Sequence, residues 1–286
     1  MNFKTLIIRT LSGAVYVALI VAAIMINDFF FAAVFAAFSA LTTFEFHKLT
    51  NKQKGVDVIP ILPAAASFLI FLCFFWILLS RNIISADIHC VSPLLYIIPV
   101  FLGVAYCILI AILFVIDFFR KEKKQTKNIF YTVFGQVYIA LPFILTAFIE
   151  FNFHKNILLA LFVIVWIYDT FAYLIGSAIG RHRLCERISP KKSWEGFFGG
   201  LIGALAAGFV CSKFISELNL LQWLGFALVI VVFGTLGDLF ESVIKRKVGV
   251  KDSGSIIPGH GGLLDRFDSM LFAAPAVFIY LSLLFI

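Results

Sequence analysis

Charged side chains are scarce in this sequence. Asp, Glu, Lys and Arg together make up 14% of its 286 residues, whereas an average soluble domain has ~25%. Hydrophobic residues reach 62%, and a soluble fold of this length has no interior large enough to hold them all. The shortage of charge therefore excludes an ordinary soluble domain. It predicts a protein whose first partner is the lipid bilayer.

Cysteine motifs are also missing. The cysteines are odd in number, and no two of them are spaced as Cys-x-x-Cys. Three lie inside apolar runs, where cysteine behaves as a small hydrophobic residue. We therefore interpret all of them as free thiols without a disulfide or zinc role. They are Cys73, Cys90, Cys107, Cys185 and Cys211.

Acidic residues are fewer than basic residues. The sequence has 16 Asp and Glu and 23 Lys and Arg, which gives a net charge of +7. Such a balance is also found in proteins that bind nucleic acid. Here, however, the aromatic residues lie in long apolar runs and not among the basic residues. Basic residues also collect in the cytoplasmic loops of membrane proteins. We therefore expect no nucleic-acid partner.

Long apolar runs are what the sequence has in abundance. A membrane-spanning helix needs roughly 20 apolar residues, and nine runs reach or approach that length. They predict an all-α fold, a polytopic transmembrane helical bundle with about nine spans. The runs cover residues 11–26, 29–46, 58–79, 94–119, 129–149, 157–180, 197–215, 221–240 and 264–286.

The two halves of the chain differ in their polar content. Residues 1–156 are mostly featureless hydrophobic sequence, which predicts a helical scaffold. Residues 157–286 carry nearly all of the unusual polar residues, which predicts that any chemistry belongs to this half. No low-complexity linker or soluble domain separates them.

Lys and Arg fall mainly on one side of the predicted spans. With the N-terminus placed in the cytoplasm, 20 of the 23 lie in inner segments, and only Arg81, Lys155 and Lys213 lie outside. Because positively charged loops stay in the cytoplasm, this asymmetry predicts a cytoplasmic N-terminus and an external C-terminus. Adding or removing one helix would destroy the pattern.

Asp169 lies near the middle of an apolar run, where a carboxylate costs at least ~2.5 kcal/mol on insertion scales. Helical spacing places it on one face with Trp166 and Tyr173. One interpretation is a structural hydrogen bond between helices. The other is a polar cavity that is open to the cytoplasm and lined by Asp169 and Tyr173.

A basic segment follows at residues 181–196. Ser189 and Pro190 suit the N-cap and first position of a helix, and Lys191 and Lys192 beside a helix N-terminus predict a phosphate site. An ordinary basic loop that only fixes topology is the alternative, but such a loop needs no Trp194-Glu195-Gly196. Small residues then recur every four positions from 196 to 208, which predicts close helix packing.

The block from residue 237 to residue 268 is the richest in polar residues. Asp238, Ser242 and Lys245 recur at about one helical turn and share a face. A basic, glycine-rich loop follows, and such loops can turn backbone N–H groups toward phosphate oxygens. Asp265 and Asp268 then face the same way at the start of the last span.

Carboxylates beside cations and glycines suit a metal-bound polyphosphate. Oxygen ligands favour Mg²⁺, which usually keeps several waters and shares phosphate oxygens. We expect Asp238 and Asp265 as the main metal ligands, with Asp268 as a third ligand or a neighbour that orients one. Whether a second, monovalent cation joins the magnesium is left open. No His/Cys cluster predicts zinc, and no Ser/His/Asp order predicts acyl hydrolysis.

The spacing in this block resembles a known signature. It runs Ser242-x2-Lys245-Arg246-x4-Lys251-Asp252-x-Gly254-x3-Pro258-x-His260-Gly261-Gly262-x2-Asp265-Arg266-x-Asp268. This run is similar to the signature of CDP-diacylglycerol synthases, also called phosphatidate cytidylyltransferases. Upstream, Asp169-Thr170-x-Ala172-Tyr173 and residues 189–196 are similar to further motifs of that family. Ser193 stands where the family often has Thr, which keeps the hydroxyl.

The resemblance implies a reaction in phospholipid biosynthesis. The phosphate of phosphatidic acid attacks the α-phosphorus of CTP and gives CDP-diacylglycerol and pyrophosphate. It further implies a homodimer in the cell inner (plasma) membrane, with the active site facing the cytoplasm and the 157–286 half as the catalytic region.

The resemblance also assigns roles to individual residues. The implied catalytic residues are Asp238, Lys245, Arg246, His260, Asp265 and Asp268, and the implied metal ligands are the three aspartates among them. The implied substrate-binding residues are Asp169, Tyr173, Ser189, Lys191, Lys192, Ser193, Trp194, Glu195, Ser242, Lys251, Asp252, Gly261, Gly262 and Arg266. Two alternatives are a different membrane lipid-phosphate transferase and an anion transporter. The aspartate motifs of CDP-alcohol and prenyl transferases are missing, and transporters often show duplicated halves, which we do not find.

Overall fold

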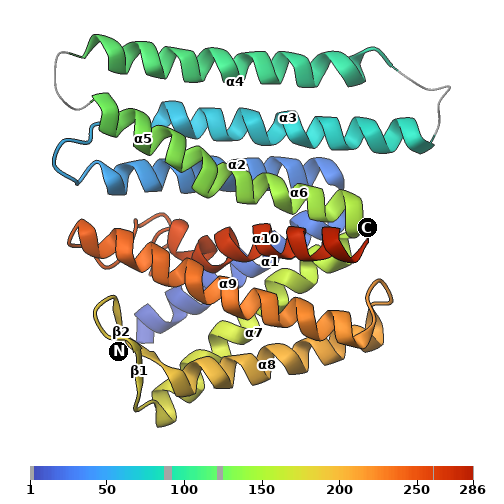
Figure 1. Ribbon diagram of the computed structural model, residues 1–286, viewed down its shortest axis with the longest axis vertical. Coiled ribbons are helices and arrows are strands. Elements are labelled where there is room, and N and C mark those ends of the chain that lie inside the picture. The colour runs from blue at the N-terminus through green and yellow to red at the C-terminus, as the bar shows by residue number, and fades with distance from the viewer. Residues whose placement is uncertain (1–2, 87–91, 121–124, 260, 286) are drawn as a thin grey trace.

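Helices account for nearly all of the computed structural model, which describes residues 3–86, 92–120, 125–259 and 261–285 (Figure 1). This confirms the predicted all-α class. The first six helical segments are α1 (Phe3–Ile26), α2 (Asp28–Thr50), α3 (Ile61–Ala86), α4 (Leu94–Phe119), α5 (Gln125–Gly135) and the π-helical turn η1 (Gln136–Ala140). They are followed by α6 (Leu141–Phe153), α7 (Lys155–Ile179), α8 (Trp194–Phe214), α9 (Leu220–Lys247) and α10 (Leu264–Leu284).

The helices match the nine predicted runs, because α5, η1 and α6 follow one another without a break. Within the described residues, eight helical segments are long and apolar enough to cross a membrane. The ninth, α1, is apolar over Thr10–Ile26 but shorter. Several apolar helices of this length in one chain make it a multi-pass membrane protein.

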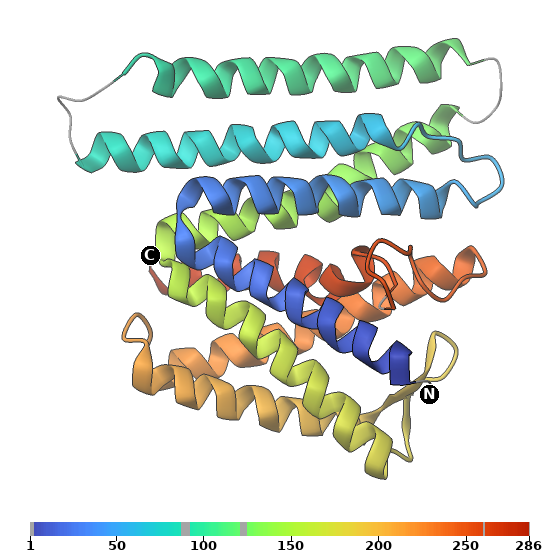
Figure 2. The same cartoon turned by 180° about the vertical axis from the view of Figure 1, so that it is seen from behind.

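The helices lie side by side in layers (Figure 1). At one edge, α4 packs on α3, and few of its residues are buried: Leu95, Pro99, Leu113 and Asp117. At the opposite edge, α7 and α8 pack closely together. Viewed from behind, α1 and α7 run obliquely through the bundle beside each other (Figure 2). The apolar surface of α4 is thus left for lipid or another chain.

Glycines on α8 allow it to approach α7, as the small-residue spacing predicts. A Cβ atom at Gly200 would lie 2.6 Å from the ring of Tyr168, and one at Gly199 would lie 2.4 Å from the Ile175 side chain. At Gly203 the added atom would meet the Phe171 ring at 2.8 Å. These distances are too short for a real Cβ contact. The close packing of α7 and α8 therefore depends on glycine, which has no side chain, at these three positions.

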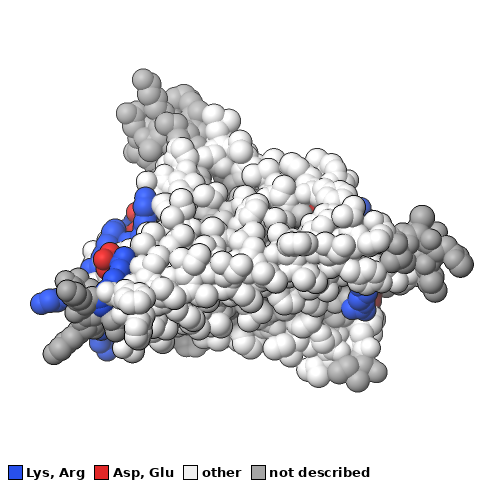
Figure 3. Space-filling view, turned by 90° about the horizontal axis from the view of Figure 1, so that it is seen from above, with Lys and Arg blue, Asp and Glu red and all other residues white. Residues whose placement is uncertain are grey.

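On the face shown in Figure 3, Lys, Arg, Asp and Glu gather mainly at the two ends of the molecule. A wide uncharged band lies between blue patches of Lys and Arg on the face shown. The N-terminus lies at the end that carries the β-hairpin, and the C-terminus lies at the other end (Figure 1). This arrangement fits a bilayer around the apolar band, and it keeps the two termini on opposite sides of that band.

Two of the differences from the predicted boundaries concern the polar residues. The run predicted at 221–240 continues as helix α9 to Lys247, so Asp238 lies within the helix and not at its end. Residues 189–193 do not begin a helix. They form strand β2 (Ser189–Ser193), which pairs antiparallel with β1 (Arg183–Cys185). Both differences arise because polar residues here find tertiary partners that hydrophobicity and local spacing do not reveal.

Candidate functional site

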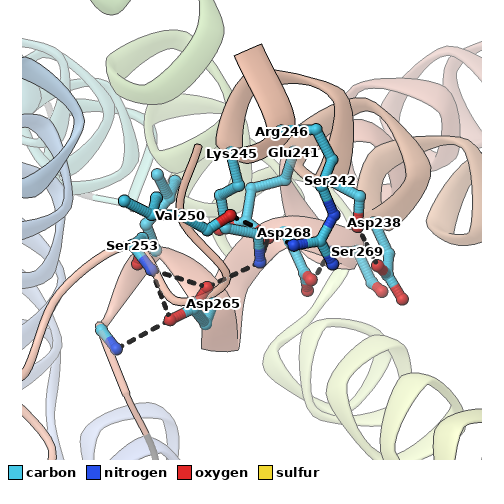
Figure 4. Close-up of polar contacts among 12 residues, drawn as sticks. Asp238, Glu241, Ser242, Lys245, Arg246, Val250, Ser253, Asp265, Asp268 and Ser269 are labelled. Carbon is cyan, nitrogen blue, oxygen red and sulfur yellow. Dashed lines mark hydrogen bonds and ion pairs between the residues drawn. The ribbon is translucent and has the colours of Figure 1, made fainter. Parts of the chain in front are cut away.

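Lys245 is the centre of a charged cluster between α9 and α10 (Figure 4). Its Nζ atom lies 2.7 Å from Asp265 Oδ1 on α10 and 2.5 Å from Glu241 Oε2 one turn earlier on α9. The side chain of Lys245 is only 11% exposed. Because a buried ammonium needs partners that replace its water, this residue fixes the start of α10 against the end of α9.

Asp265 is held by the backbone as well as by Lys245. Its Oδ2 atom accepts hydrogen bonds from the backbone N–H of Gly262 at 2.8 Å and of Ser253 at 3.0 Å. The loop between α9 and α10 therefore folds back over the first turn of α10. Gly261 has a φ of +86°, and a Cβ atom there would lie 2.7 Å from Asp265 Oδ2. This position thus favours glycine twice, by its backbone conformation and by its closeness to the carboxylate.

Asp238 has a different set of partners. Lys192 of β2 forms an ion pair with its Oδ2 atom, and the Ser242 hydroxyl donates to its Oδ1 atom at 3.5 Å. Both charged side chains are 27% exposed. The ion pair joins the β-hairpin to α9.

A polar cavity of about 240 Å³ opens beside this cluster. Its walls come from α1, α7, α10 and the loop before α10. The lining residues are Ser12, Gly13, Tyr16, Val17, Val165, Trp166, Asp169, Ile257, Asp265, Arg266 and Asp268. Asp169 therefore lies where the cavity hypothesis placed it. Tyr173 does not belong to the lining and is 74% exposed, so the structure contradicts its predicted place in the cavity wall.

The helix with a predicted N-cap at Ser189 begins four residues later. Ser193 is the N-cap of α8, and its hydroxyl accepts the backbone N–H of Gly196 at 3.1 Å. Ser189 instead pairs with Cys185 in the hairpin. Proline is tolerated on such a short two-stranded edge, so Pro190 does not mark the first helical turn. The basic strand still ends at a helix N-terminus, which lies next to Lys192.

Glu195 stabilises the hairpin. Its carboxylate accepts the backbone N–H of Arg181 at 3.1 Å and lies 2.6 Å from Nδ1 of His182. Trp194 beside it is 46% exposed. The structure thus gives Glu195 a role in holding the two ends of the 181–195 segment together.

Arg246 connects the hairpin to the loop after α9. Its Nε atom donates to the backbone carbonyl of Ile188 at 3.4 Å, and its Nη1 atom donates to that of Val250 at 3.2 Å. Lys191 follows Ile188 closely in the sequence, and Lys251 and Asp252 follow Val250. All three side chains are exposed. Two basic segments, the hairpin and the end of α9, therefore lie together.

The three predicted metal ligands do not form one group. Within the described residues, no three His, Cys, Asp or Glu side chains are arranged as a metal-binding set. Figure 4 shows Asp238 lying apart from Asp265, with Asp268 between them in this view. The Asp265 carboxylate instead accepts hydrogen bonds from Lys245 and from two backbone N–H groups. His260 lies outside the described residues.

Sequence reasoning missed contributions from the first two helices. The Tyr16 hydroxyl donates to the Arg266 carbonyl at 3.1 Å, and the Ser12 hydroxyl donates to the Pro258 carbonyl at 3.0 Å. Glu45 on α2 accepts the backbone N–H of Leu264 at 2.9 Å. Only Glu45 carried a signal in the sequence, as a lone carboxylate in an apolar run, where such groups are costly.

Together, these features define a class. The chain is a multi-pass helical membrane protein with a basic hairpin, a buried Lys–carboxylate cluster and a polar cavity at one end of its helices. More particularly, it belongs to the cytidylyltransferase family, whose sequence profile matches residues 7–284.

Curated relatives share one segment of the chain. A protein of Staphylococcus aureus strain COL that is named phosphatidate cytidylyltransferase is 51% identical over 122 residues. Proteins of the same name from Staphylococcus epidermidis strain ATCC 12228 and Staphylococcus saprophyticus are each 50% identical over 122 residues. Each match covers 42% of this chain and 46% of the relative. The chain thus spans about half the length of the curated relatives it matches.

Proposed function

We propose that this chain is a phosphatidate cytidylyltransferase, which transfers CMP from CTP to phosphatidic acid. The observation that carries the proposal is the pair of ion pairs, Lys192–Asp238 and Lys245–Asp265, at the helix ends. They place cations and carboxylates from β2, α9 and α10 beside a polar cavity. The family and the names of its relatives support the same activity. A lipid substrate also accounts for a site built on membrane helices.

In the proposed reaction, a phosphate oxygen of phosphatidic acid forms a bond to the α-phosphorus of CTP. The bond from that phosphorus to the oxygen of the β-phosphate breaks, and pyrophosphate leaves with the electron pair. The attacking phosphate is already an anion near neutral pH, so no strong general base is required. Lys192, Lys245 and Arg246 would neutralise the phosphates and hold them in line.

Magnesium is the proposed cofactor, and the residues present fit it. Asp169, Asp265 and Asp268 supply carboxylate oxygens around one cavity, and Mg²⁺ prefers such hard ligands. It commonly takes only one or two carboxylates and completes its shell with water and substrate phosphates. Asp265 is held by Lys245 and by two backbone N–H groups, whereas Asp238 is partly exposed and has only the side chains of Lys192 and Ser242 as partners. Asp238 and Asp268 are therefore the preferred ligands. A bound Mg²⁺ would neutralise charge on the pyrophosphate that leaves.

The proposed location is the cell's inner (plasma) membrane, with the site on the cytoplasmic side. The Lys and Arg asymmetry between the two sides of the spans supports this orientation. CTP is a cytoplasmic nucleotide, so a site at the basic end of the bundle is reachable for it. A homodimer is also proposed, and the uncovered apolar surface of α4 gives a candidate contact face.

The direct test uses purified protein in mixed micelles with CTP, phosphatidic acid and Mg²⁺. We expect release of one pyrophosphate per CDP-diacylglycerol formed, and none when diacylglycerol replaces phosphatidic acid. Pyrophosphate release that does not depend on phosphatidic acid would contradict the proposal. In that case, CDP-alcohol substrates would test the other lipid-transferase hypothesis, and anion uptake into proteoliposomes would test the transporter hypothesis.

A further inference from the structure

Glu45 is a buried carboxylate far in sequence from the charged cluster. It lies on α2, is 2% exposed, and accepts the backbone N–H of Leu264 through Oε2 at 2.9 Å. The two residues are 219 positions apart. A carboxylate in an apolar helical span is costly unless its contacts offset the loss of water. These contacts are with the start of α10 and with the loop before it.

The start of α10 has no cap of its own. Leu263 occupies the N-cap position and makes no side-chain capping hydrogen bond. The first N–H groups of a helix need acceptors, and a negative charge at this end is favourable because of the helix dipole. Glu45 supplies such an acceptor to Leu264, the first residue of the helix, from a different segment of the chain.

Glycines of the preceding loop fit tightly around the Glu45 carboxylate. A Cβ atom at Gly254 would lie 2.2 Å from Glu45 Oε1, and one at Gly262 would lie 2.6 Å from Oε2. A side chain at either position would therefore overlap the carboxylate, and at Gly262 it would also overlap the Ser253 hydroxyl. The carboxylate lies between two points of the loop and the helix start, so it fixes all three relative to α2.

The same loop points hold Asp265. Gly262 donates its N–H to Asp265, and so does Ser253, the neighbour of Gly254. Asp265 in turn binds Lys245. A shift of the Glu45 carboxylate would therefore move the groups that orient Asp265 and Lys245, although Glu45 touches neither in the hydrogen-bond network.

We infer that Glu45 is a positioning residue of the active site, which ties the first half of the chain to the loop that holds Asp265. The inference rests on the proposed cytidylyl transfer for its effect on rate. It assigns a part in catalysis to a helix that the sequence marks only as scaffold. Its contribution is geometric, because small displacements of catalytic groups lower the rate steeply.

The kinetic test compares Glu45→Gln and Glu45→Ala. Gln keeps the size and one oxygen acceptor for Leu264, whereas Ala leaves this N–H without its partner. We expect kcat to fall by about tenfold in Glu45→Gln and by about 100-fold in Glu45→Ala, with KM for CTP within about twofold of wild type. Ser39→Ala, a buried residue of α2 away from the loop, is the control and should keep wild-type kcat.

A kcat of Glu45→Ala within twofold of wild type would overturn the inference, and so would an equal loss in Ser39→Ala. Should Glu45→Ala fail to fold, the Gln variant decides. It is nearly isosteric, and a kcat within twofold of wild type would count against the positioning role. Rates are normalised to the folded fraction, so a loss of stability alone does not change kcat.

A second readout does not depend on activity. Hydrogen exchange of the wild type and Glu45→Gln is compared for peptides covering residues 249–264 and 183–193. We expect faster exchange in the first peptide only, because it contains the N–H groups that the carboxylate orders. Unchanged exchange at 249–264 would overturn the inference. If the wild type makes no CDP-diacylglycerol, the proposed function fails, while this measurement still decides the Glu45 contact.

Discussion

Lys245 shows how the site is built at the scale of single residues. Its ammonium lies between Glu241 and Asp265, and all three side chains are nearly or fully buried. Removing one member of a buried ion pair is more harmful than replacing the whole pair, because the other charge remains without a partner. Here two carboxylates would be left facing each other. The stability of the fold and the proposed neutralisation of the substrate phosphates therefore both depend on the Lys245 ammonium.

We expect Lys245→Met to lose both stability and activity. The unpaired carboxylates should lower the free energy of unfolding by ~3–5 kcal/mol, and turnover should fall at least about 100-fold because a phosphate-neutralising charge is gone. Thermal unfolding in detergent and pyrophosphate release measure the two effects. Lys247→Met, an exposed position on the same helix, should leave both unchanged. A fully active Lys245→Met protein would contradict the assigned role.

Arg246 differs from Lys245 in needing its shape as well as its charge. The guanidinium reaches the carbonyls of Ile188 and Val250 with two different nitrogens, which a single ammonium cannot reproduce. We expect Arg246→Lys to lower kcat/KM for CTP by ~tenfold, since breaking this link loosens the hairpin and the loop. Steady-state kinetics with varied CTP check this. Wild-type kinetics in the variant would show that charge alone suffices.

Asp238 and Asp265 should respond differently to neutralisation, because only Asp265 anchors the loop. We expect Asp238→Asn to reduce turnover at least about 100-fold and to raise the Mg²⁺ concentration needed for half-maximal rate, with little change in thermal stability. Asp265→Asn should lower turnover and thermal stability together. Titrating Mg²⁺ against rate for each variant separates them. Near-normal magnesium dependence in both would refute the metal assignment.

At the scale of elements, apolar length and spacing predict the number and approximate place of the helices. The α8 glycines also predict its close contact with α7, and the shared helical face of residues 238, 242 and 245 is confirmed. Two local signals misled. Ser189-Pro190 looks like a helix start, but β1 supplies strand pairing that local sequence does not show. The end of α9 lies beyond its apolar run, because Lys245 finds its partner on α10.

Gly200 tests the α7–α8 packing. A methyl group there would overlap the Tyr168 ring, so one helix must shift. We expect Gly200→Ala to lower stability by ~1–3 kcal/mol, a usual cost of overpacking, despite the better helix propensity of alanine. Thermal unfolding in detergent provides the measurement. Ala206→Val, at an exposed position of the same helix, is the control and should leave the thermal stability nearly unchanged. A Gly200→Ala protein as stable as the wild type would show that α7 and α8 can separate without a loss of stability.

At the scale of the whole molecule, the site is assembled from both halves of the chain. The sequence predicts chemistry only in residues 157–286, yet Ser12, Tyr16 and Glu45 contact the loop before α10 or the start of that helix. Glu45 stands out in the sequence as a carboxylate in an apolar run, but its partner does not. These contacts join residues more than 200 positions apart and use backbone carbonyl and N–H groups, which carry no sequence signal. The long-range fold, not the local motif, completes the cavity.

The orientation of the whole bundle gives a final prediction. The loops after α2, between α7 and α8 and after α9 lie at the end that carries the hairpin and the N-terminus (Figure 1). These loops are rich in Lys and Arg, and positive loops remain in the cytoplasm. In a variant without its five native cysteines, we expect Lys127→Cys to react with a membrane-impermeant maleimide only after the cells are opened. Ser216→Cys, in the loop between α8 and α9 at the other end, should react in intact cells. Both side chains are exposed, so access to the reagent and not burial decides labelling. Labelling of Lys127→Cys in intact cells would invert the topology and place the charged cluster outside, where CTP could not reach it.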